Sequence, residues 1–286
     1  RKMSKQLGNS PDPLDLIAQY GADGVRVAMM LCSSAGNDLM FDDSLCEQGR
    51  NFGNKIWNAY KLVCGWSVDA AREQSECNRL SIEWFEQRLA AAQMQIEKDF
   101  AAYRISDALL IAYRLFWDEF SGWLLEMVKP AYGDSIDECT LKAVKSIFER
   151  LMQMLHPFMP FLTEEIWQDI AERAEGESIC VSAAKVAEEA DEKLLARFEL
   201  AKEVISAVRN VRKQKNLPNK DSLTLKVIVD ENYPAEYEAV IKKMANLTSV
   251  ERVEEKDATA AAFIVKTTQY FVPLGGLIDV EAERQK

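Results

Sequence analysis

The spacing of apolar side chains predicts a series of helices along the first two thirds of the chain. Phe52, Ile56, Tyr60 and Val63 recur at three- and four-residue intervals, as on one face of a helix that begins near Ser44. The same periodicity predicts shorter helices at 13–20 and 25–31 and longer helices at 81–101, 104–129, 137–155 and 191–215. Helices joined by short connections pack as a bundle, so we expect a mainly α-helical fold.

Two features mark the end of this helical part. Thr163, followed by Glu164 and Glu165, is typical of an N-cap and an acidic first turn, and it predicts a helix over Ile166–Ala171. The next segment, 172–192, is acidic and poor in large apolar residues. We interpret it as a solvated connection.

The periodicity changes to that of a strand near residue 222. Leu223, Leu225, Val227 and Val229 occupy alternate positions, which predicts a strand with one buried face. A helix is expected at 234–246 and short strands at 250–253, 261–266 and 270–273. The predicted fold is therefore a helix bundle followed by a small α+β domain.

Length and composition exclude several classes of protein. The chain has 286 residues, enough for about two domains, and a net charge of −11 at pH 7. It contains no apolar stretch of the length of a membrane span, and its basic first residues lack the apolar core of a secretory signal. The six cysteines form no CxxC pair, so we expect reduced cysteines in a cytoplasmic protein, with no disulfide scaffold and no metal site.

His156 is the only histidine, so a Ser-His-Asp triad or a histidine-based metal site would have to use it. It lies between apolar residues and prolines in LHPFMP. Burial is commoner than chemistry for such a residue, so we interpret it as a packed histidine at a helix end.

The sharpest motif lies at the start of the chain, where residues 2–9 read KMSKQLGN. It resembles the KMSKS signature of class I aminoacyl-tRNA synthetases, with Gln6 in place of the last serine. Activating an amino acid with ATP develops charge on the phosphates, and lysines on a mobile loop can stabilise that charge. The resemblance implies that Lys2 and Lys5 are catalytic and that Lys5 contacts the ATP phosphates.

The continuation is similar to one family within that class, the valyl-tRNA synthetases. The similar segments follow in order: SPDPLDLI (10–17), YGADGVR (20–26), GNDLMFDD (36–43), RNFGNKIWNA (50–59), LHPFMPFLTEEIWQ (155–168) and PLGGLID (273–279). Isoleucyl and leucyl enzymes carry related motifs and are the closest alternative. The family's HIGH motif and editing domain are absent, so we expect a C-terminal fragment that does not activate valine alone.

The resemblance implies four regions. They are the KMSKS loop with connecting, stem-contacting helices (1–45), an anticodon-binding helix bundle (46–190), a helix plus a small α+β domain (191–276) and the start of a coiled-coil arm (277–286). The implied partners are valine tRNA and the rest of a monomeric synthetase, which would attach valine to its tRNA through valyl-adenylate. ATP would be a substrate of that parent enzyme, with no metal bound by the fragment and no membrane partner.

One face of the helix that begins near Ser44 is a candidate for reading RNA. At 100° per residue, Arg50, Asn51, Asn54, Lys55 and Asn58 lie on one side, opposite the apolar residues. Arginine and lysine suit phosphates, and asparagine can pair with exposed base edges. The alternative is a solvated polar face whose asparagines cap neighbouring elements. The family resemblance favours RNA.

A second candidate is a basic stretch at 202–220, which includes Arg209, Arg212, Lys213 and Lys215. Segregated positive charge can bind phosphates even in an acidic protein, because such contacts act over about a Debye length, roughly 8–10 Å. The alternative is a helix C-terminus that favours cations.

A different class of function remains to be weighed, that of a helical protein-interaction module. Such a module would keep the bundle but expose an apolar groove in place of a polar helix face and a basic stretch.

Overall fold

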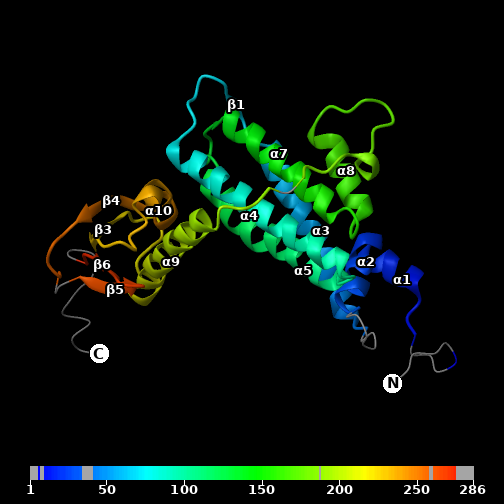
Figure 1. Cartoon of the computed structure of the whole chain (residues 1–286), viewed down its shortest axis with the longest axis horizontal. Coiled ribbons are helices and arrows are strands. Elements are labelled where there is room, and N and C mark those ends of the chain that lie inside the picture. The colour runs from blue at the N-terminus through cyan, green and yellow to red at the C-terminus, as the bar shows by residue number, and fades with distance from the viewer. Residues whose placement is uncertain (1–5, 7–9, 34–40, 187, 258–259, 275–286) are drawn as a thin grey trace. The chain divides into compact units, whose positions relative to one another are not determined.

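The computed structural model describes residues 6, 10–33, 41–186, 188–257 and 260–274 (Figure 1). The chain divides into two compact units. The first comprises Arg1–Gln74, Phe85–Leu125 and Lys129–Ala190, and the second comprises Ser75–Trp84, Glu126–Val128 and Asp191–Lys286. None of the helices in the described ranges combines the length and the apolar character that a bilayer crossing requires.

The first unit is a bundle of helices, as the apolar spacing predicted. Its helices are α1 (Pro13–Tyr20), α2 (Ala22–Leu31), α3 (Asp43–Cys64), most of α4 (Glu76–Ala101), α5 (Ile105–Arg114), α7 (Glu138–Leu155) and α8 (Pro160–Ile170). α2 packs along α3, and α7 packs against both α3 and α5 (Figure 1). Two-residue strands, β1 (Val68–Asp69) and β2 (Ile136–Asp137), pair in parallel.

Four phenylalanines form the centre of this bundle. Phe52 from α3 meets Phe116 edge-on at 5.9 Å between ring centroids, and Phe120 meets Phe148 of α7 at 5.3 Å. All four side chains are fully buried. Burying one such ring stabilises the fold by roughly 1.5–3 kcal/mol, so this cluster fixes the position of α3 in the bundle.

The helix predicted at 104–129 is interrupted by a π-helix. α5 is followed by η2 (Leu115–Leu124), which has π geometry, and by one turn of α-helix, α6 (Leu125–Val128). The buried residues Phe116, Phe120 and Leu124 recur every four positions, a spacing that suits either kind of helix. The apolar pattern therefore could not distinguish them.

The predicted start of α8 was wrong. The helix begins at Pro160, and Thr163 is a buried residue inside it, with no capping role. Proline is favoured in the first turn because its missing N–H has no intrahelical partner there. The Thr163 hydroxyl instead donates a hydrogen bond to the Met159 carbonyl oxygen at 2.8 Å.

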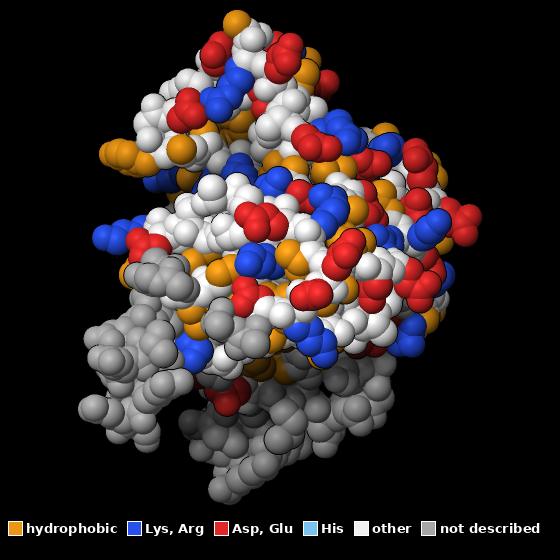
Figure 2. Space-filling view, turned by 90° about the vertical axis from the view of Figure 1, so that its left-hand side faces the viewer, with side chains coloured by type: hydrophobic (Ala, Val, Ile, Leu, Met, Phe, Trp, Pro, Cys, Tyr) orange, Lys and Arg blue, Asp and Glu red, His pale blue; other side chains and the backbone are white. Residues whose placement is uncertain are grey.

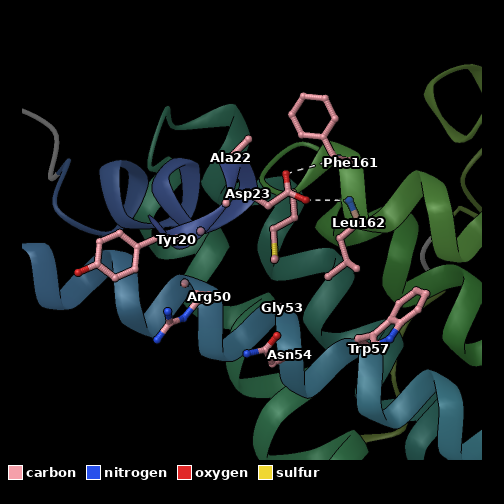
Figure 3. A pocket seen from close by; sticks show the side chains of 13 residues that line it. Tyr20, Ala22, Asp23, Arg50, Gly53, Asn54, Trp57, Phe161 and Leu162 are labelled. Atoms are coloured by element: carbon pink, nitrogen blue, oxygen red, sulfur yellow. Dashed lines mark hydrogen bonds between the residues drawn. The ribbon is translucent and has the colours of Figure 1, made fainter. Parts of the chain in front are cut away.

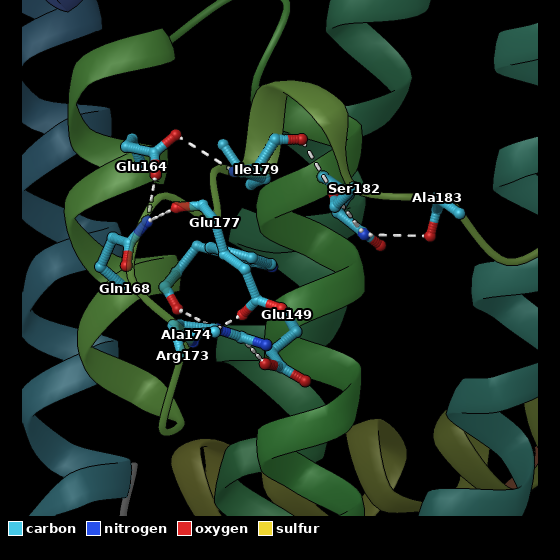
Figure 4. A network of polar contacts seen from close by, with 11 residues as sticks. Glu149, Glu164, Gln168, Arg173, Ala174, Glu177, Ile179, Ser182 and Ala183 are labelled. Atoms are coloured by element: carbon cyan, nitrogen blue, oxygen red, sulfur yellow. Dashed lines mark hydrogen bonds and ion pairs between the residues drawn. The ribbon is translucent and has the colours of Figure 1, made fainter.

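The interpretation of 172–192 as a solvated connection was also incomplete. The segment contains a 3-10 turn, η3 (Ile179–Val181), and Ile179 is buried. Figure 4 shows how polar side chains attach this segment to α7 and α8. The Gln168 amide of α8, for example, donates to the Glu177 carbonyl oxygen at 2.6 Å.

The second unit contains helices and a small sheet, in agreement with the predicted α+β fold class, and it also includes Ser75–Trp84 and Glu126–Val128. Its elements are α9 (Glu192–Gln214), β3 (Leu223–Ile228), η4 (Ala235–Tyr237), α10 (Glu238–Ala245), β4 (Leu247–Arg252), β5 (Ala261–Val265) and β6 (Thr268–Val272). The strand order is β4-β3-β6-β5, with β3 parallel to β4 and antiparallel to β6. α9 and α10 pack together against this sheet.

The alternation predicted for β3 is confirmed over most of its length. Leu223, Leu225 and Val227 are buried, whereas Val229 lies beyond the strand and is exposed. Phe198 of α9 stacks on Trp84 at 4.4 Å and meets Tyr237 edge-on at 4.8 Å. These aromatic contacts form part of the core of the second unit.

Candidate functional site

A cleft of about 300 Å³ opens beside α3 in the first unit. Figure 3 shows Tyr20 and Trp57 toward its two ends, with Arg50 and Asn54 of α3 between them. The turn between α1 and α2 and the first turn of α8 complete its walls, as far as Leu162. We call this the α3 cleft. Two of the five residues predicted on the polar face of this helix, Arg50 and Asn54, line it.

Close contact between two glycines brings α2 and α3 together beneath the cleft. A Cβ atom on Gly49 would lie 2.3 Å from the Gly24 carbonyl oxygen, and one on Gly24 would lie 3.1 Å from the Arg50 amide nitrogen. A Cβ atom 2.3 Å from a backbone oxygen cannot be accommodated, so Gly49 requires glycine for this helix spacing, whereas a Cβ atom on Gly24 would require its neighbours to move by a few tenths of an ångström.

The GADGVR motif also attaches α2 to the turn between α7 and α8. Asp23 accepts hydrogen bonds from the amide N–H groups of Leu162 at 2.7 Å and Phe161 at 3.4 Å, and so caps α8 (Figure 3). Arg26 donates to the carbonyl oxygens of Pro157 and Phe158. Burial raises the pKa of Asp23, although the two N–H groups and Arg26 favour its charged form.

The side chains of Arg50 and Asn54 differ in the contacts that they already make within the protein. The Arg50 guanidinium lies 5.5 Å from the centroid of the Tyr20 ring and 3.8 Å from the Glu47 carboxylate. The Asn54 amide is exposed and makes no hydrogen bond within the described part of the chain. Asn54 is therefore available to a ligand without loss of an internal bond.

The other predicted residues of this face do not line the α3 cleft. Lys55 is half-buried, and its ammonium lies 5.1 Å from the centroid of the Trp117 ring in η2. Asn51 and Asn58 are exposed, and among the described residues their amides also lack a hydrogen-bond partner. The alternative that these amides cap neighbouring helices thus has no hydrogen bond to support it in the described structure.

The basic stretch of α9 separates into a buried and an exposed part. Arg212 is 3% exposed and donates to the carbonyl oxygens of Pro218, Asp221, Ala245 and Asn246 at 2.7–3.1 Å. Burial lowers the pKa of its guanidinium. All of these partners belong to the second unit, so Arg212 holds the end of α9 to the loop and helix beside it.

The remaining basic residues are open to solvent to different degrees. Arg209 and Lys213 are exposed and Lys215 is half-buried. Arg209 also donates to the Met244 carbonyl oxygen at 3.1 Å. On the face in Figure 2, Lys and Arg side chains are interspersed with Asp and Glu and form no single large basic patch.

Family comparison identifies the larger part of this structure. Residues 83–229, just over half of the chain, match the family described as the anticodon-binding domain of tRNA ligase. The chain belongs to that family. Residues 1–42 match a second family, class I tRNA synthetases (I, L, M and V). The α8 wall of the cleft lies inside the anticodon-binding domain match, and α3 lies in sequence between the two matches.

Similarity over the whole of this chain extends to individual tRNA ligases. The valine--tRNA ligase of Parabacteroides distasonis is 52% identical over 100% of this chain and 32% of that protein. That of Bacteroides thetaiotaomicron is 53% identical over 99% of the chain and 32% of its own length. That of Fusobacterium nucleatum is 34% identical over 100% of the chain and 34% of its own length. The chain therefore spans about a third of the length of these relatives.

Solved structures are also similar to this chain. One of them is the ternary complex of Agrobacterium radiobacter K84 LeuRS with tRNA and LeuAMS, with 17% identity and a TM-score of 0.49. It covers 68% of this chain, and the chain covers 23% of it.

Lys2 and Lys5, which the KMSKS resemblance predicts to be catalytic, lie outside the described residues. Their assignment to the ATP phosphates therefore stays a prediction.

Sequence reasoning missed the aromatic part of the α3 cleft. Phe161 lies within the apolar LHPFMPFL stretch, but its side chain is 66% exposed at the cleft. Tyr20 and Trp57 were not among the predicted RNA-contacting residues, which were all cations and amides. For Phe161, the available signal was the pair of prolines, Pro157 and Pro160. Prolines at this spacing predict a turn, where an apolar side chain can be exposed, rather than a continuous buried helix.

Sequence reasoning also missed a group of possible metal ligands. The side chains of His156, Glu164 and Cys180 come together beside the turn between α7 and α8, with their ligand atoms within 4.8 Å of one another. As predicted, His156 lies at a helix end, where it is the C-cap of α7.

Proposed function

We propose that this chain is the tRNA-binding C-terminal region of a valine--tRNA ligase, and that the α3 cleft receives an unpaired anticodon base. The observation that carries the proposal is the cleft itself. It places Asn54, whose amide has no hydrogen bond among the described residues, and a cation, Arg50, among three aromatic side chains in a protein of the anticodon-binding family.

The chemistry of the α3 cleft suits a flipped-out base. Unpaired RNA bases are recognised by stacking on aromatic rings or guanidinium planes and by hydrogen bonds to their edges. Tyr20, Trp57 and Phe161 offer ring faces, and the Asn54 amide can both donate and accept. A volume of about 300 Å³ is at the small end of ligand sites, which fits one planar ring system.

The other contacts proposed for tRNA are less specific. Asn51, Lys55 and Asn58 continue the polar face of α3 and would contact nucleotides beside the bound base. Arg209, Lys213 and Lys215 would contact phosphates, which carry no base identity. We leave Arg212 out of this set, because its donors are already bound to four carbonyl oxygens.

The catalytic role belongs to the parent enzyme, which we propose to be a cytoplasmic monomer. Its reaction joins valine to tRNA through valyl-adenylate, with ATP as substrate and with Lys2 and Lys5 stabilising the phosphates. The HIGH motif is absent from this chain, so the chain alone should show no valine-dependent pyrophosphate exchange above background. Exchange well above background would contradict that assignment.

Electrophoretic mobility shift with purified chain tests the tRNA-binding proposal. Valine tRNA should bind more tightly than a transcript with an altered anticodon, by roughly 1–3 kcal/mol for one directly read base. That difference is about fivefold to 150-fold in Kd. Isoleucine and leucine tRNAs serve as competitors that test the closest alternatives. Equal affinity for all four RNAs would refute specific anticodon reading.

A further inference from the structure

Three side chains that commonly bind metals meet where α7, α8 and η3 converge in the first unit. His156 caps the end of α7, Glu164 lies in α8, and Cys180 lies in η3. Their ligand atoms lie within 4.8 Å of one another, and the His156 Nε2 to Cys180 Sγ distance is 3.0 Å. This group plays no part in the proposed tRNA contacts.

The hydrogen bonds of His156 orient its Nε2 lone pair toward the sulfur. Thr163 Oγ1 donates its proton to the Met159 carbonyl oxygen, so it accepts the 2.7 Å hydrogen bond from His156 Nδ1–H. Nε2 is then unprotonated and faces Cys180 Sγ. An imidazole whose other ring nitrogen is held by a polar partner is the usual form of a metal-binding histidine.

Glu164 is held just as firmly. Its carboxylate accepts hydrogen bonds from Gln168 Nε2 at 2.7 Å, Ser178 Oγ at 2.7 Å and the Ile179 amide at 3.2 Å (Figure 4). Three donors leave about one of the four lone-pair positions of the carboxylate for a cation.

The segment that carries Cys180 is attached on both sides of it. Ser178 and Ile179 bind Glu164 from α8, and Ser182 accepts a hydrogen bond from the Gln153 amide of α7 at 2.9 Å. Cys180 itself is exposed, so solvent can reach the sulfur. The three candidate ligands are thus positioned before any cation binds, with one open side.

We propose that His156, Glu164 and Cys180 form a binding site for one divalent cation of the zinc class, with water as the fourth ligand. A nitrogen, an oxygen and a sulfur donor suit Zn²⁺, which takes bonds of about 2.0–2.3 Å in tetrahedral geometry. Binding replaces the thiol proton of Cys180, which is released to solvent. The Nε2–Sγ separation needs to open by only about 0.5 Å to match tetrahedral ligand spacing.

The consequence would be a clamp on the turn between α7 and α8. Met159, Phe161 and Leu162, which line the α3 cleft, lie between His156 and Glu164 in sequence. A cation that joins the two ends of this turn would restrict its motion. The metal site does not depend on the proposed tRNA role, and its test needs no RNA.

Titration of the reduced, metal-free chain with Co²⁺ alone tests the site, because cobalt reports a thiolate ligand by a charge-transfer absorption band. One equivalent should produce that band, and one equivalent of Zn²⁺ should remove it. Cys180→Ser should abolish the band, and Glu164→Gln should weaken binding by about tenfold or more. Cys139→Ser removes another exposed cysteine, on α7, and should leave the band unchanged.

Thermal unfolding provides a readout that is independent of cobalt spectroscopy. Zn²⁺ should raise the Tm of the wild-type chain and of Cys139→Ser, but not that of Cys180→Ser. A cobalt band that survives Cys180→Ser would overturn the proposal. So would the lack of any band, or an equal Tm shift in all three proteins.

Discussion

Gly49 of α3 lies so close to Gly24 of α2 that a Cβ atom on Gly49 would be 2.3 Å from the Gly24 carbonyl oxygen. The neighbouring atoms are backbone, which cannot rotate away as a side chain could. This contact determines how closely the two helices approach and therefore how the α3 cleft is formed.

Gly49→Ala should accordingly destabilise the chain by about 1–3 kcal/mol, as expected when a packed interface is forced to accept an extra carbon. Urea unfolding measures this loss. Gly53→Ala on the same helix is the matched control, because its Cβ would meet only side-chain atoms at 3.5 Å. Equal stability of the two variants would show that the α2–α3 interface can relax.

Asp23 provides a prediction about helix capping. Asp23→Ala should cost about 0.5–2 kcal/mol, because the first N–H groups of α8 lose their acceptor. Asp23→Asn keeps one acceptor oxygen and should cost less. Urea unfolding at neutral pH compares the three proteins, and equal losses in both variants would contradict the capping role.

The raised pKa of Asp23 also predicts a pH dependence. Between the ordinary pKa of 3.8 and the higher folded value, the folded protein binds more protons than the unfolded chain. The contribution of Asp23 to stability therefore falls as pH rises through that window. The stability of wild type relative to Asp23→Asn should decrease over this range, and the opposite slope would show that hydrogen bonding outweighs burial.

Arg209 and Arg212 should behave differently although they are three residues apart. Arg212→Met leaves carbonyl oxygens without a donor and should cost about 2–4 kcal/mol of stability. Arg209→Gln should leave the Tm nearly unchanged and reduce the salt dependence of tRNA binding by about one unit of slope. Melting curves and binding at several salt concentrations separate the two roles. If Arg209→Gln leaves the slope unchanged, Arg209 does not contact a phosphate.

The fold could be predicted largely from periodicity because most helices and β3 bury one face. Features that depend on residues distant in the sequence could not be predicted in this way. Thr163 matches an N-cap pattern, but Asp23, far away in sequence, caps α8 instead. The grouping of Arg212 with the exposed cations failed for the same reason, since the carbonyl oxygens that bind it come from the following loop and from the end of α10.

In the candidate site, too, spacing within one helix could be used for prediction, whereas contacts between helices could not. The polar face of α3 follows from helical spacing, and it correctly placed Arg50 and Asn54 on one side. Spacing within one helix cannot show which side chains of other helices meet that face, so Tyr20 and Phe161 were missed. Nor could counting cysteines find the group of Cys180 with His156, because a single cysteine and a single histidine from separate elements leave no spacing motif.

Discrimination between anticodons by Asn54→Ala and Asn58→Ala tests the central claim most directly. Four proteins are compared: wild type, the two variants and a control, Asn210→Ala, which changes an exposed asparagine on α9. For each protein we measure the Tm and the Kd for valine tRNA and for an anticodon-altered transcript. Asn54→Ala should lose roughly 1–3 kcal/mol of discrimination between the two RNAs, and Asn58→Ala should lose a similar amount if its contact with a base is direct. The Tm of each variant should shift only by the small amount that corresponds to a stability change of about 0.5 kcal/mol or less. Asn210→Ala should discriminate between the two RNAs as well as wild type does. A lowered Tm with full anticodon discrimination in Asn54→Ala would contradict the account and make this face structural.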